Sequence, residues 1–226
     1  MFSFDVEAGE LHVYDEIGPE WAGMIGGSSV VDALKQMGGK DITMYLSTPG
    51  GSIDEGTIIY NAIERYTGRV KIVVDSIAAS MGSYILQAAD ERVVASNAKL
   101  MIHNPWGVAI GDSVEMRSMA SVLDKYGEAL VAKYAERSGK DAKEVAKLMD
   151  AETWYLGQEI VDAGFADSVS GVATKDIDAK ALARWARNIP AAVQAELSAP
   201  KREQAKTATL RMTVEDAKRK IAAMKR

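Results

Sequence analysis

The chain of 226 residues is 47% hydrophobic and 26% charged, as in ordinary globular proteins, and it contains no cysteine and only two histidines, His12 and His103. This composition excludes disulfides, a thiol nucleophile and thiolate metal sites, and we expect no metal and no cofactor. Residues 1–170 carry 26 acidic and 14 basic side chains, whereas residues 171–226 carry 6 acidic and 13 basic ones. The acidic part should repel nucleic acid, and the basic part could bind acidic surfaces.

No apolar run approaches the ~20 residues of a membrane helix, and the first residues lack the basic and apolar regions of a signal peptide. We therefore expect a cytoplasmic protein that does not contact a membrane.

The first half of the chain alternates strand and helix patterns. The expected elements are a hairpin over Phe2–Ile17, a helix over Val30–Met37 that Ser28 or Ser29 caps, a strand over Asp41–Ser47, a helix over Ile53–Arg65, a strand over Val70–Asp75 and a helix over Ala78–Ala89.

The second half continues the alternation up to about residue 170. The expected elements are strands over Arg92–Ala95 and Lys99–Ile102, a long amphipathic helix over Ser113–Arg137, helices over Ala142–Leu148 and Gln158–Ala163, and a strand over Phe165–Val169. Strands that alternate with helices indicate an α/β domain with a largely parallel sheet.

The composition changes after Gly171, so we expect one domain over residues 1–170 and an extension over residues 171–226. The extension holds 14 alanines in 56 residues and is interrupted by Pro190 and Pro200. Leu182, Trp185 and Ile189 could form one apolar stripe, and residues 214–225 have a helical pattern. The extension could be helical or disordered, and it is basic and alanine-rich.

Ser80 lies between an apolar strand and an apolar helix, where a tight turn could expose its hydroxyl. The start of the helix would favour negative charge beside it. A serine at this place could equally cap the helix.

His103 follows the strand Lys99–Ile102, and a partly desolvated imidazole there could act as a base. A histidine at a strand end could instead make only structural hydrogen bonds. Thr48-Pro49-Gly50-Gly51 follows another strand, and its free amides could bind an oxyanion, although the same residues make an ordinary turn. Asp150, Glu152 and Glu159 could orient the histidine or serve as surface carboxylates.

Four motifs in this order resemble the ClpP family of serine peptidases. They are Thr-Pro-Gly-Gly (48–51), Ala-Ala-Ser-Met-Gly-Ser (78–83), Met-Ile-His-Asn-Pro (101–105) and the segment 152–169, which begins Glu-Thr-Trp-Tyr. The resemblance covers about residues 10–170. It implies a crotonase-like core of stacked βαβ units, with the long helix Ser113–Arg137 as a projecting "handle" used between subunits of a homo-oligomeric ring, heptameric or stacked.

The resemblance also implies roles for residues. Ser80 matches the nucleophile, His103 the general base, and Gly51 and Met81 the backbone donors of the oxyanion hole. The acid falls on Glu152, where the family usually has aspartate, and Asp150 remains a rival.

Two departures resemble the ClpP-related head maturation proteases of tailed bacteriophages. The chain enters almost at the first core hairpin, which leaves little room for the axial loops that contact an unfoldase, and its basic extension is longer than in housekeeping members. We therefore expect an ATP-independent serine endopeptidase that processes polypeptides such as scaffold and capsid proteins.

Other interpretations of the sequence stay open. The chain could be a housekeeping proteolytic subunit that works with an unfoldase, or a catalytically silent assembly protein on the crotonase fold. An acyl-CoA enzyme or binding module could use the same core. A serine–lysine dyad with Lys99 is a variant of the mechanism.

Overall fold

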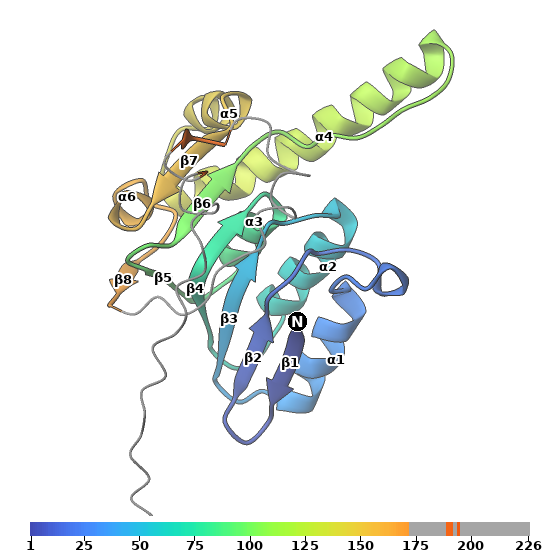
Figure 1. The fold of residues 1–226 in the computed structure, drawn as a ribbon. Helices are drawn as coiled ribbons and strands as arrows, with labels where there is room; N and C mark the ends of the chain where they lie inside the picture. The colour runs from blue at the N-terminus through green and yellow to red at the C-terminus, as the bar shows by residue number, and fades with distance from the viewer. Residues whose placement is uncertain (172–188, 192–193, 195–226) are drawn as a thin grey trace, which may run out of the picture.

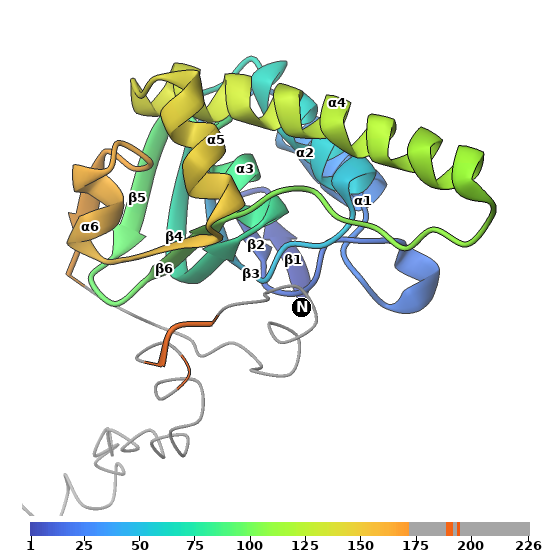
Figure 2. The ribbon, with the colours of Figure 1, turned by 90° about the horizontal axis from the view of Figure 1, so that it is seen from above.

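The computed structural model describes residues 1–171, 189–191 and 194. The predicted helix over residues 214–225 and the stripe residues Leu182 and Trp185 lie outside this part. In the described part, the chain folds into an eight-stranded, largely parallel sheet with helices packed mainly on one face (Figures 1 and 2). The predicted α/β class and the projecting helix are thereby confirmed.

Strands β1 (Phe2–Asp5) and β2 (Glu10–Val13) form the expected hairpin, which turns at Gly9 with φ 67°. A short 3-10 helix, η1 (Glu20–Ala22), follows the hairpin. Helix α1 (Gly27–Met37) begins three residues earlier than predicted, and Gly26 rather than a serine side chain stands at its N-cap. The helix ends, as expected, at Gly38 in the left-handed conformation.

Strands β3 (Ile42–Thr48) and β4 (Val70–Ala79) form the centre of the sheet and flank helix α2 (Ile53–Glu64), whose N-cap is the Ser52 side chain. Strand β4 is longer than predicted, and helix α3 is correspondingly short, at Met81–Leu86. Residues 76–79, which the apolar pattern assigned partly to a helix, continue the strand because a second neighbour binds them there.

Strand β4 changes neighbour along its length. Its first half pairs with β5 (Glu91–Ala95), and its last three residues pair with β6 (Lys99–Ile102). Strand β6 in turn pairs antiparallel with β7 (Thr153–Leu156), a strand that the sequence pattern does not predict. This branch of the sheet places the ends of β4 and β6 side by side.

Helix α4 (Ser113–Ser138) is the predicted long helix, and its first half projects away from the sheet (Figure 1). Of its residues only Leu130 and Tyr134, near the C-terminal end, are buried. Helices α5 (Ala142–Asp150) and α6 (Gln158–Asp162) follow, and β8 (Ser168–Ser170) starts later than predicted because Phe165 is a core side chain before the strand.

One apolar core fills the space between the sheet and the helices. In β3 and β4 every second residue is buried over the first half, and both strands end in three consecutive buried residues. Within the described residues, none of the helices combines the length and apolar character needed to cross a membrane.

Candidate active site

Ser80 occupies the turn between β4 and α3 in an unusual backbone conformation, with φ 52° and ψ −123°. A non-glycine residue with positive φ costs of order 1–3 kcal/mol and persists where its surroundings hold it. Its amide donates to the carbonyl of Met101 at 2.9 Å, and its side chain makes no capping hydrogen bond to α3. The turn therefore presents the Ser80 hydroxyl away from the helix it precedes.

His103 directly follows β6 and reaches Ser80. Its Nε2 lies 2.9 Å from Ser80 Oγ, within hydrogen-bond distance, and its side chain is 8% exposed. The pairing follows from the register, because Ala79 and Met101 are opposite each other on β4 and β6. Each strand then delivers its polar residue at the same edge.

Glu152 lies on the other side of the imidazole. Its Oε2 is 3.8 Å from His103 Nδ1, which is longer than a hydrogen bond but close enough for strong electrostatic contact between two buried groups. Glu152 has a positive φ of 51° in the turn between α5 and β7, and its amide donates to Met149.

The other two acidic candidates lie elsewhere. Asp150 is exposed at the end of α5, where its Oδ1 accepts a 2.7 Å hydrogen bond from Asn104 Nδ2. Glu159 accepts from the amide of Leu156. Among the three carboxylates, the structure therefore brings Glu152 to His103.

The glycine pair after β3 lies against the Ser80 turn. A Cβ on Gly50 would be 2.6 Å from Ser80 Cβ and 2.8 Å from the Met81 nitrogen, so only glycine fits there. Ile17 forms a parallel bridge to this segment, with its amide donating to Gly50 O and its carbonyl accepting from Ser52 N. Since alternate residues of an extended chain point to opposite sides, the Gly51 N–H points away from Ile17.

Met81 is the first residue of α3, and the first amides of a helix have no acceptor within it. The Gly51 and Met81 amides thus belong to two segments that meet beside Ser80. Amides at such a place are suited to bind developing negative charge.

Ser83 and Tyr134 form a buried network under the turn that sequence reasoning missed. Ser83 Oγ lies 2.7 Å from the Ser80 carbonyl, 2.8 Å from the Met101 carbonyl and 2.7 Å from the Tyr134 hydroxyl. Burial raises the pKa of the Tyr134 phenol well above its usual value, so it stays neutral. The network ties α4 to the backbone at the ends of β4 and β6. Ser83 lies within the serine motif, three residues after Ser80, whereas no motif in the sequence marks Tyr134.

Lys99 pairs in register with Ile77, two residues before the Ala79–Met101 pair on the way to Ser80 and His103. The hydrogen bond described for Ser80 Oγ goes to His103, so nothing in this geometry favours the serine–lysine dyad. No group of three or more histidine, aspartate or glutamate side chains suited to a metal ion occurs among residues 1–171, 189–191 and 194. The expectation that the reaction needs no metal or cofactor stays a prediction.

Comparison with known families agrees with this geometry. The family model for Clp protease matches residues 20–173, about two thirds of the chain and all of the strands that carry Ser80, His103 and Glu152. The chain belongs to the Clp protease family. Members of the Clp protease family are ClpP-type serine peptidases, so hydrolysis of peptide bonds by a serine nucleophile is the activity that the family assigns to this fold.

Proposed function

We propose that this Clp protease family member is an ATP-independent serine endopeptidase whose triad is Ser80, His103 and Glu152. The 2.9 Å contact between Ser80 Oγ and His103 Nε2 carries the proposal, because a nucleophile within hydrogen-bond reach of its base is what acyl transfer requires. Glu152 is the acid in place of the usual aspartate, and its longer side chain reaches His103 Nδ1 from the turn before β7.

The proposed reaction has two halves. Ser80 Oγ attacks the scissile carbonyl carbon while His103 Nε2 takes the hydroxyl proton. The carbonyl oxygen becomes an oxyanion, to which the amides of Gly51 and Met81 donate, each worth about 3–4 kcal/mol. The C–N bond then breaks and His103 protonates the leaving amine. Water, deprotonated by His103, attacks the acyl-enzyme and releases the carboxylic acid with the proton returned to Ser80.

A fluorophosphonate serine-hydrolase probe tests this triad. We expect the probe to label Ser80, and Glu152→Gln to slow labelling by about 10³–10⁴-fold because the imidazolium loses its counter-charge and orientation. Asp150→Asn is the matched control and should label at the parent rate, since Asp150 contacts Asn104 rather than His103. Labelled sites are found by mass spectrometry.

Two results would contradict the proposal. Equal labelling of Glu152→Gln and the parent protein would remove Glu152 from the triad. No labelling of the parent protein, with Ser80→Ala and His103→Ala indistinguishable from it, would favour the silent assembly protein instead.

We further propose that the substrates are scaffold and capsid proteins of a tailed bacteriophage during head maturation. The support is the basic extension, whose 13 basic side chains against 6 acidic ones suit an acidic protein surface. Purified protein should cleave the scaffold or capsid protein encoded by the same genome without ATP. Cleavage only when an unfoldase and ATP are added would assign the chain to the housekeeping type.

A further inference from the structure

The branch of the sheet that carries the catalytic residues is apolar on both faces except for the buried Lys99 of β6, which pairs in register with Ile77 and Leu156. Alternate residues of β4, β6 and β7, namely Ala78, Leu100, Ile102 and Tyr155, pack in or against the main core. The residues between them face the other way and form a second cluster. We call this cluster the outer apolar face; it consists of Ile77, Ala79, Met101, Trp154 and Leu156.

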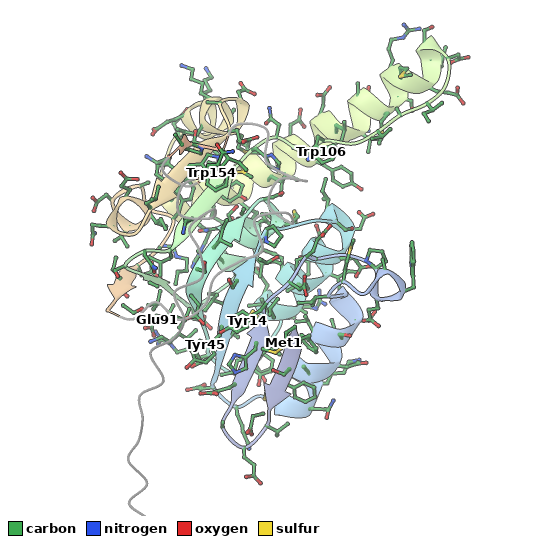
Figure 3. The ribbon with its side chains drawn as sticks, in the orientation of Figure 1. Met1, Tyr14, Tyr45, Glu91, Trp106 and Trp154 are labelled. Carbon is green, nitrogen blue, oxygen red and sulfur yellow. The ribbon has the colours of Figure 1, made fainter. Side chains whose placement is uncertain are left out.

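The outer apolar face is covered. Ile77, Ala79 and Met101 have no exposed surface at all, and Trp154 and Leu156 are partly buried (Trp154 is labelled in Figure 3). Figure 2 shows helices α1, α2 and α4 over the opposite side of the sheet, and the buried apolar residues of α3 and α5 belong to the main core, so these helices do not provide this cover. Apolar strands need a cover on each face, because exposed apolar surface of this size is unfavourable in water.

Ile189 of the C-terminal extension supplies a cover. Its side chain packs against the outer apolar face, and the segment 189–191 lies on the side of the sheet away from the helices (Figure 2). Pro190 follows, and its carbonyl accepts a 2.9 Å hydrogen bond from the amide of Gln194, which closes one helical turn. Among the described residues of the extension, Ala191 and Gln194 are exposed, and Ile189 is the apolar side chain that packs against this face.

We propose that the outer apolar face is a docking surface for the chain's own segment 189–191, which anchors the basic extension beside the catalytic strands. The occupant is this segment of the same molecule because the described residues already seat Ile189 on the face. Seventeen residues lie between Gly171 and Ile189, and a chain of this length easily spans one face of the domain.

Within the described part of the chain, Trp154 Nε1 is buried and has no hydrogen-bond partner. A buried donor without an acceptor costs free energy, so apolar contacts must hold this face closed.

Docking also bears on the nucleophile through Met101. The Met101 side chain belongs to the covered face, and its carbonyl accepts from both the Ser80 amide and Ser83 Oγ. A segment that holds Met101 in place therefore supports the backbone that positions Ser80.

Cysteine trapping tests the docking in a clean background, because the chain has no cysteine of its own. The full-length Ser80→Ala protein, which cannot cleave itself, would carry Leu156→Cys with Ile189→Cys. The control pair is Leu156→Cys with Gln194→Cys, whose second site is exposed. Oxidation should cross-link the Ile189→Cys pair within one chain, and the yield should not change on about tenfold dilution, because tethered groups meet at millimolar effective concentration.

Each other outcome overturns the proposal. A cross-linked dimer on a non-reducing gel would mean that a second copy covers the face. Cross-linking no faster than in the control pair would mean that Ile189 does not dock.

A second variant tests the same docking without a cross-link. Ile189→Asp should speed amide hydrogen exchange in residues 99–102 and 153–156 several-fold, while Ala191→Asp, two residues away and exposed, should not. Unchanged exchange in Ile189→Asp would overturn the docking. Neither measurement uses catalysis, so their failure leaves the proposed peptidase activity standing, and failure of probe labelling leaves the docking standing.

Discussion

At the residue scale, the site depends on a few positions where the backbone has no freedom. Ser80 and Glu152 are the two non-glycine residues of the described chain with positive φ, and both lie at the candidate triad. Local strain of this kind is retained where the surrounding structure holds it, here through Met101, Met149 and the buried hydroxyl of Ser83. The two residues with strained backbone are therefore also two members of the proposed triad.

Gly50 offers a sharp test at this scale. Gly50→Ala places a methyl group 2.6 Å from Ser80 Cβ at a φ of 92°, so the Ser80 turn must move. We expect probe labelling of Ser80 to fall by about 10²-fold, the usual cost of misplacing a reacting group by ~1 Å. Gly23→Ala is the matched control: its φ is 78° but nothing lies within 4 Å of the new methyl group, so it should keep the labelling rate. Similar losses in both variants would show that backbone strain alone is responsible.

At the element scale, Arg92 of β5 binds the segment that precedes β8. Its guanidinium donates to Asp167, to Gln87 Oε1 and to the carbonyls of Gly164 and Arg137, and it is 8% exposed. One buried side chain thus connects β5 to the ends of α3, α4 and α6. None of these hydrogen bonds of Arg92 goes to Ser80 or His103.

Removing Arg92 should cost stability without changing the chemistry. Arg92→Met is expected to lower the free energy of unfolding by about 2 kcal/mol, since hydrogen bonds to charged groups contribute about 1.5–3 kcal/mol and Asp167 is partly screened by water. Urea denaturation at pH 7 measures the change. A loss of catalytic labelling per folded molecule would contradict a purely structural role.

The same pair predicts a pH dependence. Burial raises the pKa of Asp167, but the hydrogen bonds and charge of Arg92 outweigh it, so the folded pKa lies below the usual 3.8. The stabilising contribution is thus present above pH 3.8 and is lost as the pH falls through the lower, folded pKa. As the pH falls below 5, the free energy of unfolding should therefore decrease less in Asp167→Asn than in the parent protein.

At the scale of the whole molecule, the projecting half of α4 and the segment before it expose apolar side chains. Val108, Ile110 and Val114 are 76%, 93% and 64% exposed, and Met116 and Val122 are also open. Soluble monomers rarely expose such a patch, so it is consistent with an interface between subunits; the homo-oligomeric ring and its size stay predictions.

A negative charge introduced into this surface by substitution should dissociate the oligomer. Ile110→Asp is expected to shift the sedimentation coefficient to that of a monomer while leaving thermal unfolding of the subunit nearly unchanged, because the Ile110 side chain is 93% exposed. Ala142→Asp adds the same charge at the exposed start of α5 and should sediment like the parent protein. A parent protein that is monomeric at micromolar concentration would contradict the interface.

Local patterns in the sequence were sufficient to predict most of the helices and strands and to single out Ser80 and His103 as candidate site residues. Strand and helix periodicities predict the alternation of β3, α2, β4 and the following elements, and the motifs around Ser80 and His103 mark two polar residues at strand ends. These signals are local, because burial on one face repeats every two or about 3.6 residues and a tight turn needs small residues.

Tertiary structure decided what depends on partners distant in sequence. Strand β7 has only four residues and forms because β6 pairs with it, and β4 runs on to Ala79 because β6 binds its end. The choice of Glu152 over Asp150 follows from a left-handed turn that points one carboxylate to His103 and the other to Asn104. The hydroxyls of Ser83 and Tyr134 likewise meet across 51 residues of sequence. Ile189 packs against the cluster that contains Met101, 88 residues earlier in the chain. No periodicity in the sequence encodes contacts at these separations.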